Sequence, residues 1–222
     1  GTLSVVTVDG GDPSLYTATF TPAVDTESVT NVISVGTGYT DAALNAGIAN
    51  SSANYVVDTK APTVAVTLAD SALSKGETTL VTFTFSEAVS GFSNADLTIG
   101  SGTLSAVTVD GGDPTLYTAT FTPTDDISSA TNVISVANTY TDVAGNTGTA
   151  NSSANYTVNT VAPTVAITLD DSALITGETA LVTFDFSVAP LGFANDDVTI
   201  GSGTLSAVTV DGGDPSLYTA TF

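Results

Sequence analysis

The sequence predicts an all-β protein made of tandem β-sandwich domains, and three observations support this prediction. Apolar and polar residues alternate along short runs, as in Val81, Phe83 and Phe85 around Thr82 and Thr84, which is typical of strands with one face in a core. Clusters such as DGGDP, GSG and AGN separate these runs at hairpin-like spacing. No segment keeps a 3.6-residue apolar period, so we expect no long helix.

The chain repeats itself every 101 residues. The motif GTLS begins at Gly1, Gly102 and Gly203, and APTV begins at Ala61 and Ala162. Solenoid units are about 20 to 50 residues long, whereas a period of about 100 is the size of one compact domain. We therefore expect an array of separate domains joined end to end.

The first four strands of the complete period follow from alternation and from the turns around them. Residues 63–68 (TVAVTL) follow a proline, and residues 80–86 (LVTFTFS) alternate apolar and hydroxyl side chains. Residues 96–99 (DLTI) and 104–109 (LSAVTV) lie on the two sides of GSG. We name these predicted strands A to D.

The last three strands complete the predicted domain. Residues 116–122 (LYTATFT) come after the DGGDP turn, and residues 132–140 and 150–158 lie before and after AGN. These are strands E, F and G. Seven short strands in about 100 residues is the size and count of an immunoglobulin-like sandwich.

Domain boundaries are expected in front of each APTV motif. Residues 61–161 then form a complete repeat, residues 1–60 carry strands D to G of one copy, and residues 162–222 carry strands A to E of another. Neither partial copy can close a sandwich alone. Two interpretations follow: the chain is a window on a longer polymer, or neighbouring molecules complete the partial domains by strand complementation.

Composition excludes several classes of function. The chain has 23 acidic residues against two basic ones, Lys60 and Lys75, which gives a net charge of −21. Nucleic acids and anionic membranes would repel such a chain, and no apolar run is long enough to insert into a membrane. Because His, Cys, Met, Trp and Arg are absent, imidazole bases, thiolates and Cys or His zinc sites are excluded.

The motifs occur in a characteristic order: APTV, GET, VTFTFSEAVSGF, NADLTIGSGTLS, YTATFTP, YTDVAGN and NYTV, with DTKAP between domains. This order resembles the bacterial Ig-like repeats of large surface adhesins and biofilm-associated proteins, and the resemblance covers the whole chain. It implies an extracellular spacer at the bacterial cell surface, working in cell adhesion and commonly stiffened by calcium. It supplies no enzyme activity.

Three carboxylates are expected to converge where the linker enters the complete repeat. Asp58 lies in the linker VVDTKAP, Glu87 follows strand B, and Asp142 opens the F to G loop in YTDVAGN. In an immunoglobulin-like sandwich these loops lie beside the incoming linker, and Ca²⁺ takes six to eight oxygen ligands. We therefore predict a structural Ca²⁺ site, with Asp41 at the position of Asp142 in the first copy. The alternative is that these are solvated loop acids.

The next junction offers an internal comparison. Asn159 stands at the position of Asp58, and Val188 stands at the position of Glu87. Both carboxylates are lost together, so we expect this junction to bind calcium weakly or not at all. It should also be the more flexible of the two.

The function predicted from sequence is that of a non-enzymatic spacer that holds a terminal binding module away from the cell. Its partners would be neighbouring Ig-like repeats in the same or adjacent chains, and the adhesive target is left open. One alternative is a self-assembling extracellular filament subunit. Another is a carbohydrate- or ice-binding module that uses outward threonines, although Thr simply suits the solvent face of a strand.

Overall fold

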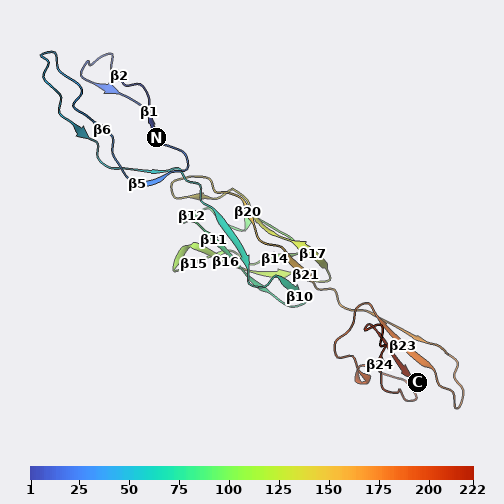
Figure 1. Cartoon of the computed structure of the whole chain (residues 1–222). Coiled ribbons are helices and arrows are strands. Elements are labelled where there is room, and N and C mark those ends of the chain that lie inside the picture. Colours follow the sequence, from blue (N-terminus) through green and yellow to red (C-terminus); the bar gives the residue numbers. More distant parts are fainter. The chain divides into compact units, whose positions relative to one another are not determined.

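The computed structural model describes residues 1–222. The chain divides into two compact units, Gly1–Thr160 and Val161–Phe222. Strands, turns and irregular segments make up the chain (Figure 1), apart from two short 3-10 helices at Asn94–Asp96 and Asn195–Asp197. None of its helices has the length and apolar character needed to cross a membrane.

The complete repeat begins with a sheet that contains predicted strands A, B, D and E. Its strands are β14 (Gly102–Leu104), β16 (Asp113–Pro123), β11 (Thr79–Phe85) and β9 (Val64–Leu68), in that spatial order, and β15 (Thr108–Asp110) also pairs with β16. All neighbours are antiparallel. The alternation along β11 places every second side chain in the core.

The facing sheet contains predicted strands C, F and G. One ladder has the order β13, β18, β20, and a second has the order β10, β21, β17. Their bounds are β10 (Ala72–Ser74), β13 (Leu97–Ile99), β17 (Ser128–Asn132), β18 (Ile134–Val136), β20 (Asn151–Ser152) and β21 (Tyr156–Asn159). With strands A, B, D and E in one sheet and C, F and G in the other, the predicted immunoglobulin-like sandwich is confirmed.

Polar side chains divide strands that the sequence predicts as continuous. Residues 132–140 and 150–158 each break into two pieces, because side chains replace ladder bonds there. The backbone N–H of Asn132 donates to Asn155 Oδ1 (2.9 Å), and that of Ile134 donates to Ser153 Oγ (3.1 Å). The predicted strand D, residues 104–109, is likewise two strands, β14 and β15.

Strand β10 is an element that the sequence prediction missed. After β9 has paired with β11 in the first sheet, the chain crosses to the second sheet, where β10 runs parallel to β21. Leu73 is its one buried side chain. The second strand of the repeat therefore lies beside its last strand.

The core of the complete repeat lies between the two sheets. Its largest fully buried side chains include Phe83, Phe121, Ile134, Tyr140 and Tyr156. Aromatic rings meet edge to face across the sandwich, with centroid distances of 5.0 Å for Phe85–Tyr140 and 5.2 Å for Phe121–Tyr156. Such pairs add about 0.5 to 1.5 kcal/mol each beyond the burial of their area.

The first partial copy forms separate pairs of strands, and most of its side chains are exposed. The pairs are β1 (Thr2–Leu3) with β4 (Phe20–Thr21), β2 (Thr7–Val8) with β3 (Tyr16–Thr17), β5 (Glu27–Asn31) with β8 (Tyr55–Asp58), and β6 (Ser34–Val35) with β7 (Asn50–Ser51). Val57 is the buried apolar residue of this part.

The C-terminal unit forms a single four-stranded antiparallel sheet. Its order is β22 (Val165–Leu169), β23 (Leu181–Phe186), β25 (Leu217–Thr221) and β24 (Thr209–Val210). A small core of Val182, Phe184 and Ala220 lies on one face. The domain boundaries expected at residues 60 and 161 stay predictions.

Candidate metal centre

Three separate elements position the three carboxylates. Asp58 is the last residue of β8, and Glu87 follows β11. Asp142 lies in β19 (Thr141–Asp142), which pairs with β12 (Val89–Ser90). The position of Asp142 corrects one detail of the prediction, because this residue belongs to a short strand and is only 2% exposed.

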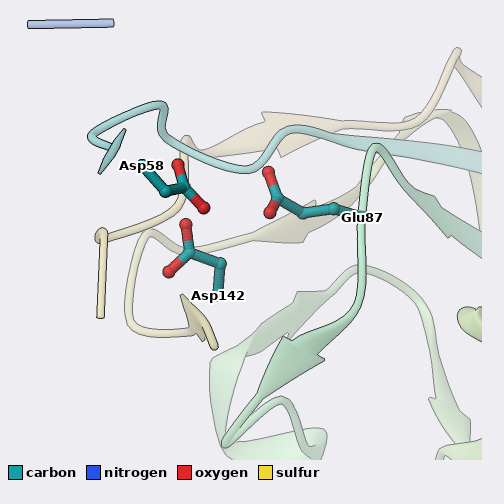
Figure 2. A group of neighbouring side chains, drawn as sticks. All are labelled: Asp58, Glu87 and Asp142. Carbon is teal, nitrogen blue, oxygen red and sulfur yellow. The ribbon is translucent and has the colours of Figure 1, made fainter. Parts of the chain in front are cut away.

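The structure brings the three carboxylates together. One oxygen from each of Asp58, Glu87 and Asp142 lies within 4.8 Å of the other two. Figure 2 shows the side chains pointing toward one another, Asp58 from the linker side and the other two from the repeat. This arrangement concentrates negative charge that a cation would neutralise.

Asn146 connects two of the three carboxylates. Its backbone N–H donates to Asp142 Oδ1 (2.8 Å), and its Nδ2 donates to Asp142 Oδ2 (2.7 Å). The same Nδ2 lies 3.3 Å from both the backbone oxygen and Oδ1 of Asp58. The sequence prediction missed this residue, although it is the last residue of the AGN cluster between predicted strands F and G.

Burial and neighbouring charges disfavour the ionised form of Glu87. Burial raises the pKa of its carboxyl, and the charges of Asp142, Asp58 and Glu27 raise it further, while Lys60 opposes them. A raised pKa means that the folded protein resists ionisation of Glu87. A bound cation would reverse that resistance.

Asp142 behaves in the opposite way. Burial by itself raises the pKa of Asp142, but hydrogen bonds from the side chain and backbone of Asn146, and from the N–H groups of Gly145 and Ala144, outweigh it. The pKa therefore lies below its ordinary value. The turn holds Asp142 ionised and ready to act as a ligand.

The donor set fits a hard divalent cation. The three side chains offer carboxylate oxygens only, and the chain contains no His or Cys that would favour a softer metal. Ca²⁺ tolerates irregular oxygen shells at about 2.3 to 2.6 Å and completes them with carbonyls and water. Mg²⁺ demands a more regular octahedral shell.

Asp41, the fourth predicted ligand, lies apart from this group. Its carboxylate accepts hydrogen bonds from Ala43 N (2.9 Å), Asn45 N (2.9 Å) and Asn45 Nδ2 (2.8 Å), and these lower its pKa, the side chain of Asn45 most of all. It is exposed and belongs to no group of three acidic side chains. A metal at Asp41 stays a prediction.

The positions that match Asp58 and Glu87 one repeat later are both exposed. Asn159 ends β21, and Val188 follows β23. Neither side chain carries a charge. The predicted difference in calcium affinity between the two junctions stays a prediction.

Comparison with known proteins identifies three tandem regions. A family model described as "Bacterial Ig-like domain" matches residues 1–57, 58–158 and 159–222, so Asp58 opens the second match. The solved structure of FdeC, described as a broadly conserved Escherichia coli adhesin, is 17% identical over 93% of this chain and 81% of that one, with a TM-score of 0.37. That likeness carries no functional argument. No curated protein matches the chain.

Proposed function

Because the chain belongs to the bacterial Ig-like domain family, we propose that it is a structural extender of a bacterial surface adhesin. Three tandem family matches along one chain are the observation that carries this proposal. Serial sandwiches add length without needing a ligand or a catalytic group. The proposed place of work is outside the cell, where the array holds a binding module away from the surface.

The proposal includes calcium at Asp58, Glu87 and Asp142. Asp58 belongs to the strand that leads into the linker, whereas Glu87 and Asp142 belong to the complete repeat. A cation held by all three would tie the linker to the repeat and restrict the hinge. An extracellular-type site of about 10⁻⁴ M, at a hundredfold excess of calcium, would add roughly 2.7 kcal/mol to the folded state.

Calcium titration of the full chain tests this site. The wild-type protein should bind calcium by calorimetry and melt at a higher temperature in its presence. The variant Asp58→Asn with Glu87→Val should do neither. Its new residues are those that the chain itself carries at Asn159 and Val188, so the substitutions are compatible with the repeat.

The matched control removes the same charge elsewhere. Asp125→Asn with Asp126→Asn also eliminates two carboxylates, both on exposed residues outside the three-carboxylate group. This control should retain the wild-type response to calcium. Equal binding heats and equal melting shifts in all three proteins would refute the proposed site.

Limited digestion with trypsin is a second test of whether calcium restricts the hinge, because the chain contains just two basic residues at which trypsin can cut. Lys60 lies in the linker, two residues after Asp58, and Lys75 lies in a turn of the complete repeat. Calcium should slow cleavage after Lys60 several-fold and leave cleavage after Lys75 unchanged. A uniform change at both sites would point to a general effect on the protease or on the fold.

A further inference from the structure

Glu27 lies directly opposite Asp58 at the end of the ladder formed by β5 and β8. The backbone N–H of Thr59 donates to the carbonyl oxygen of Thr26 (2.8 Å), which makes Glu27 and Asp58 a non-hydrogen-bonded pair. In such a pair the two side chains share one face and come closest, with Cβ atoms about 4.5 to 5.5 Å apart. Glu27 therefore places a fourth carboxylate within reach of the three-carboxylate group.

The side chain of Thr59 fixes this register. Its Oγ1 accepts a hydrogen bond from the backbone N–H of Thr26 (3.0 Å) and donates one to the carbonyl oxygen of Ala23 (2.7 Å). The complete repeat contains the same arrangement at Thr160, whose Oγ1 accepts from the backbone N–H of Ile127 (3.0 Å). The register at the end of this ladder is therefore built into the repeat.

The pairing of Glu27 with Asp58 is unfavourable without a cation. Like charges directly opposite each other destabilise an antiparallel ladder. The charge of Glu27 also acts on Glu87, whose pKa is raised first by burial and then by the charges of Asp142, Asp58 and Glu27, with Lys60 alone opposing them. Four carboxylates beside one ammonium leave a negative charge that a divalent cation would balance.

A comparison of successive periods connects Glu27 with the same group. Twelve acidic residues have a counterpart 101 positions later, and nine of these counterparts are acidic as well. Loss of the other three as a set is expected if they serve one ion, and it is not expected of independent solvated acids. These three are Glu27, Asp58 and Glu87, and their counterparts are Ser128, Asn159 and Val188.

We propose that Glu27 is a fourth carboxylate ligand of the calcium ion proposed at Asp58, Glu87 and Asp142. This role of Glu27 rests on the proposed function, and it adds that the ion holds both strands of the ladder instead of β8 alone. Two points of attachment restrict rotation of the ladder about the ion more than one point does. The affinity of calcium sites depends on the number of charged ligands, so Glu27 should tighten binding.

Calorimetric titration of the full chain with calcium tests this role, comparing the wild type with Glu27→Ser. Serine is the residue that the chain itself carries at the same ladder position, where Ser128 lies opposite Asn159. Glu27 is also exposed, so the fold should be retained. The variant should bind calcium with the wild-type stoichiometry, but its Kd should rise at least about tenfold.

Asp25→Asn is the matched control. Asp25 is exposed, lies two residues before Glu27, and has an acidic counterpart one period later, Asp126. Its φ of 52° is a conformation that Asn adopts readily. The control removes the same charge from the same turn, so it measures the long-range part of the electrostatic effect. At physiological salt its Kd should stay within about twofold of the wild-type value.

Thermal melting in a chelator provides a measurement that does not depend on bound calcium. Glu27→Ser should raise the melting temperature there, because it removes the repulsion of Asp58. This gain should disappear when Asp58→Asn is already present, since the two side chains act on each other. In calcium the sign should reverse, because the variant then loses a ligand.

The outcomes separate this role from the proposed site itself. If the wild type binds calcium and Glu27→Ser binds it with an unchanged Kd, Glu27 is no ligand and the three-carboxylate site stands. Equal weakening by Glu27→Ser and Asp25→Asn would likewise refute the role of Glu27, because long-range charge would explain it. A wild type that binds no calcium would overturn both the site and the role of Glu27.

Discussion

The loops at Asp41 and Asp142 are the same turn in different surroundings. In each, an Asn four residues later donates its backbone N–H and its Nδ2 to the carboxylate, at 2.9 and 2.8 Å for Asn45 and at 2.8 and 2.7 Å for Asn146. Asp41 is exposed and alone, whereas Asp142 is buried beside two other carboxylates. The turn therefore orients one carboxylate in both copies, but only the fold of the complete repeat brings two further carboxylates beside it.

Removing the asparagine should separate the two loops most strongly. Asn146→Ala leaves a buried carboxylate without its side-chain donor, which is expected to lower the free energy of unfolding by about 1 to 3 kcal/mol. Asn45→Ala leaves an exposed carboxylate that water can solvate, so we expect no measurable loss. Chemical denaturation of both variants measures the difference. Equal losses would show that burial does not distinguish the loops.

A backbone difference between the loops should have a smaller effect. Gly145 has φ of +93° and no atom near the place of a Cβ, whereas the first copy has Leu44 at φ of +69°. Gly145→Ala should therefore cost about 1 kcal/mol through backbone strain alone. Gly111→Ala, at another open position without positive φ, is the control for denaturant unfolding. An unchanged free energy of unfolding in Gly145→Ala would show that the backbone at this position is not strained by a side chain.

The smallest effect concerns the charge of Glu87 and depends on pH. The folded-state pKa of Glu87 lies above its ordinary value of 4.5, so this carboxyl costs stability as pH rises from that value through the raised pKa. Without calcium, Glu87→Gln should raise the melting temperature slightly at pH 7 and change little below pH 4.5.

With calcium the sign should reverse, because the variant loses a ligand. Thermal melts of wild type and Glu87→Gln, with chelator and with calcium, measure both signs. Destabilisation by Glu87→Gln in chelator would contradict the repulsion that we assign to this group. Stabilisation in calcium would contradict its role as a ligand.

The sequence predicted the sandwich and the meeting of three carboxylates, because both depend on strand order. Alternation in 80–86 and 116–122 identifies strands B and E, and the order of strands places Asp58, Glu87 and Asp142 at one end. Both inferences require only that the strands are correctly identified along the chain. They do not need the local geometry.

The sequence did not predict the local geometry of the short strands and loops. β10 has three residues and one buried side chain, which is too short for an alternation to be recognised. The breaks in strands F and G come from Asn155 and Ser153 accepting backbone hydrogen bonds. Likewise, the contact of Asn146 with Asp58 joins residues 88 positions apart and exists only after folding.

The parallel pairing of β10 with β21 has a mechanical consequence for a chain that is pulled from both ends. Ala72 lies opposite Thr157, and Ser74 lies opposite Asn159. The N-terminal side of the chain therefore reaches this ladder at Ala72, and the C-terminal side leaves it at Asn159, at the opposite end. We expect tension along the chain to load these hydrogen bonds in shear, all at once, instead of opening them one after another. The seam that closes the domain thus also resists extension.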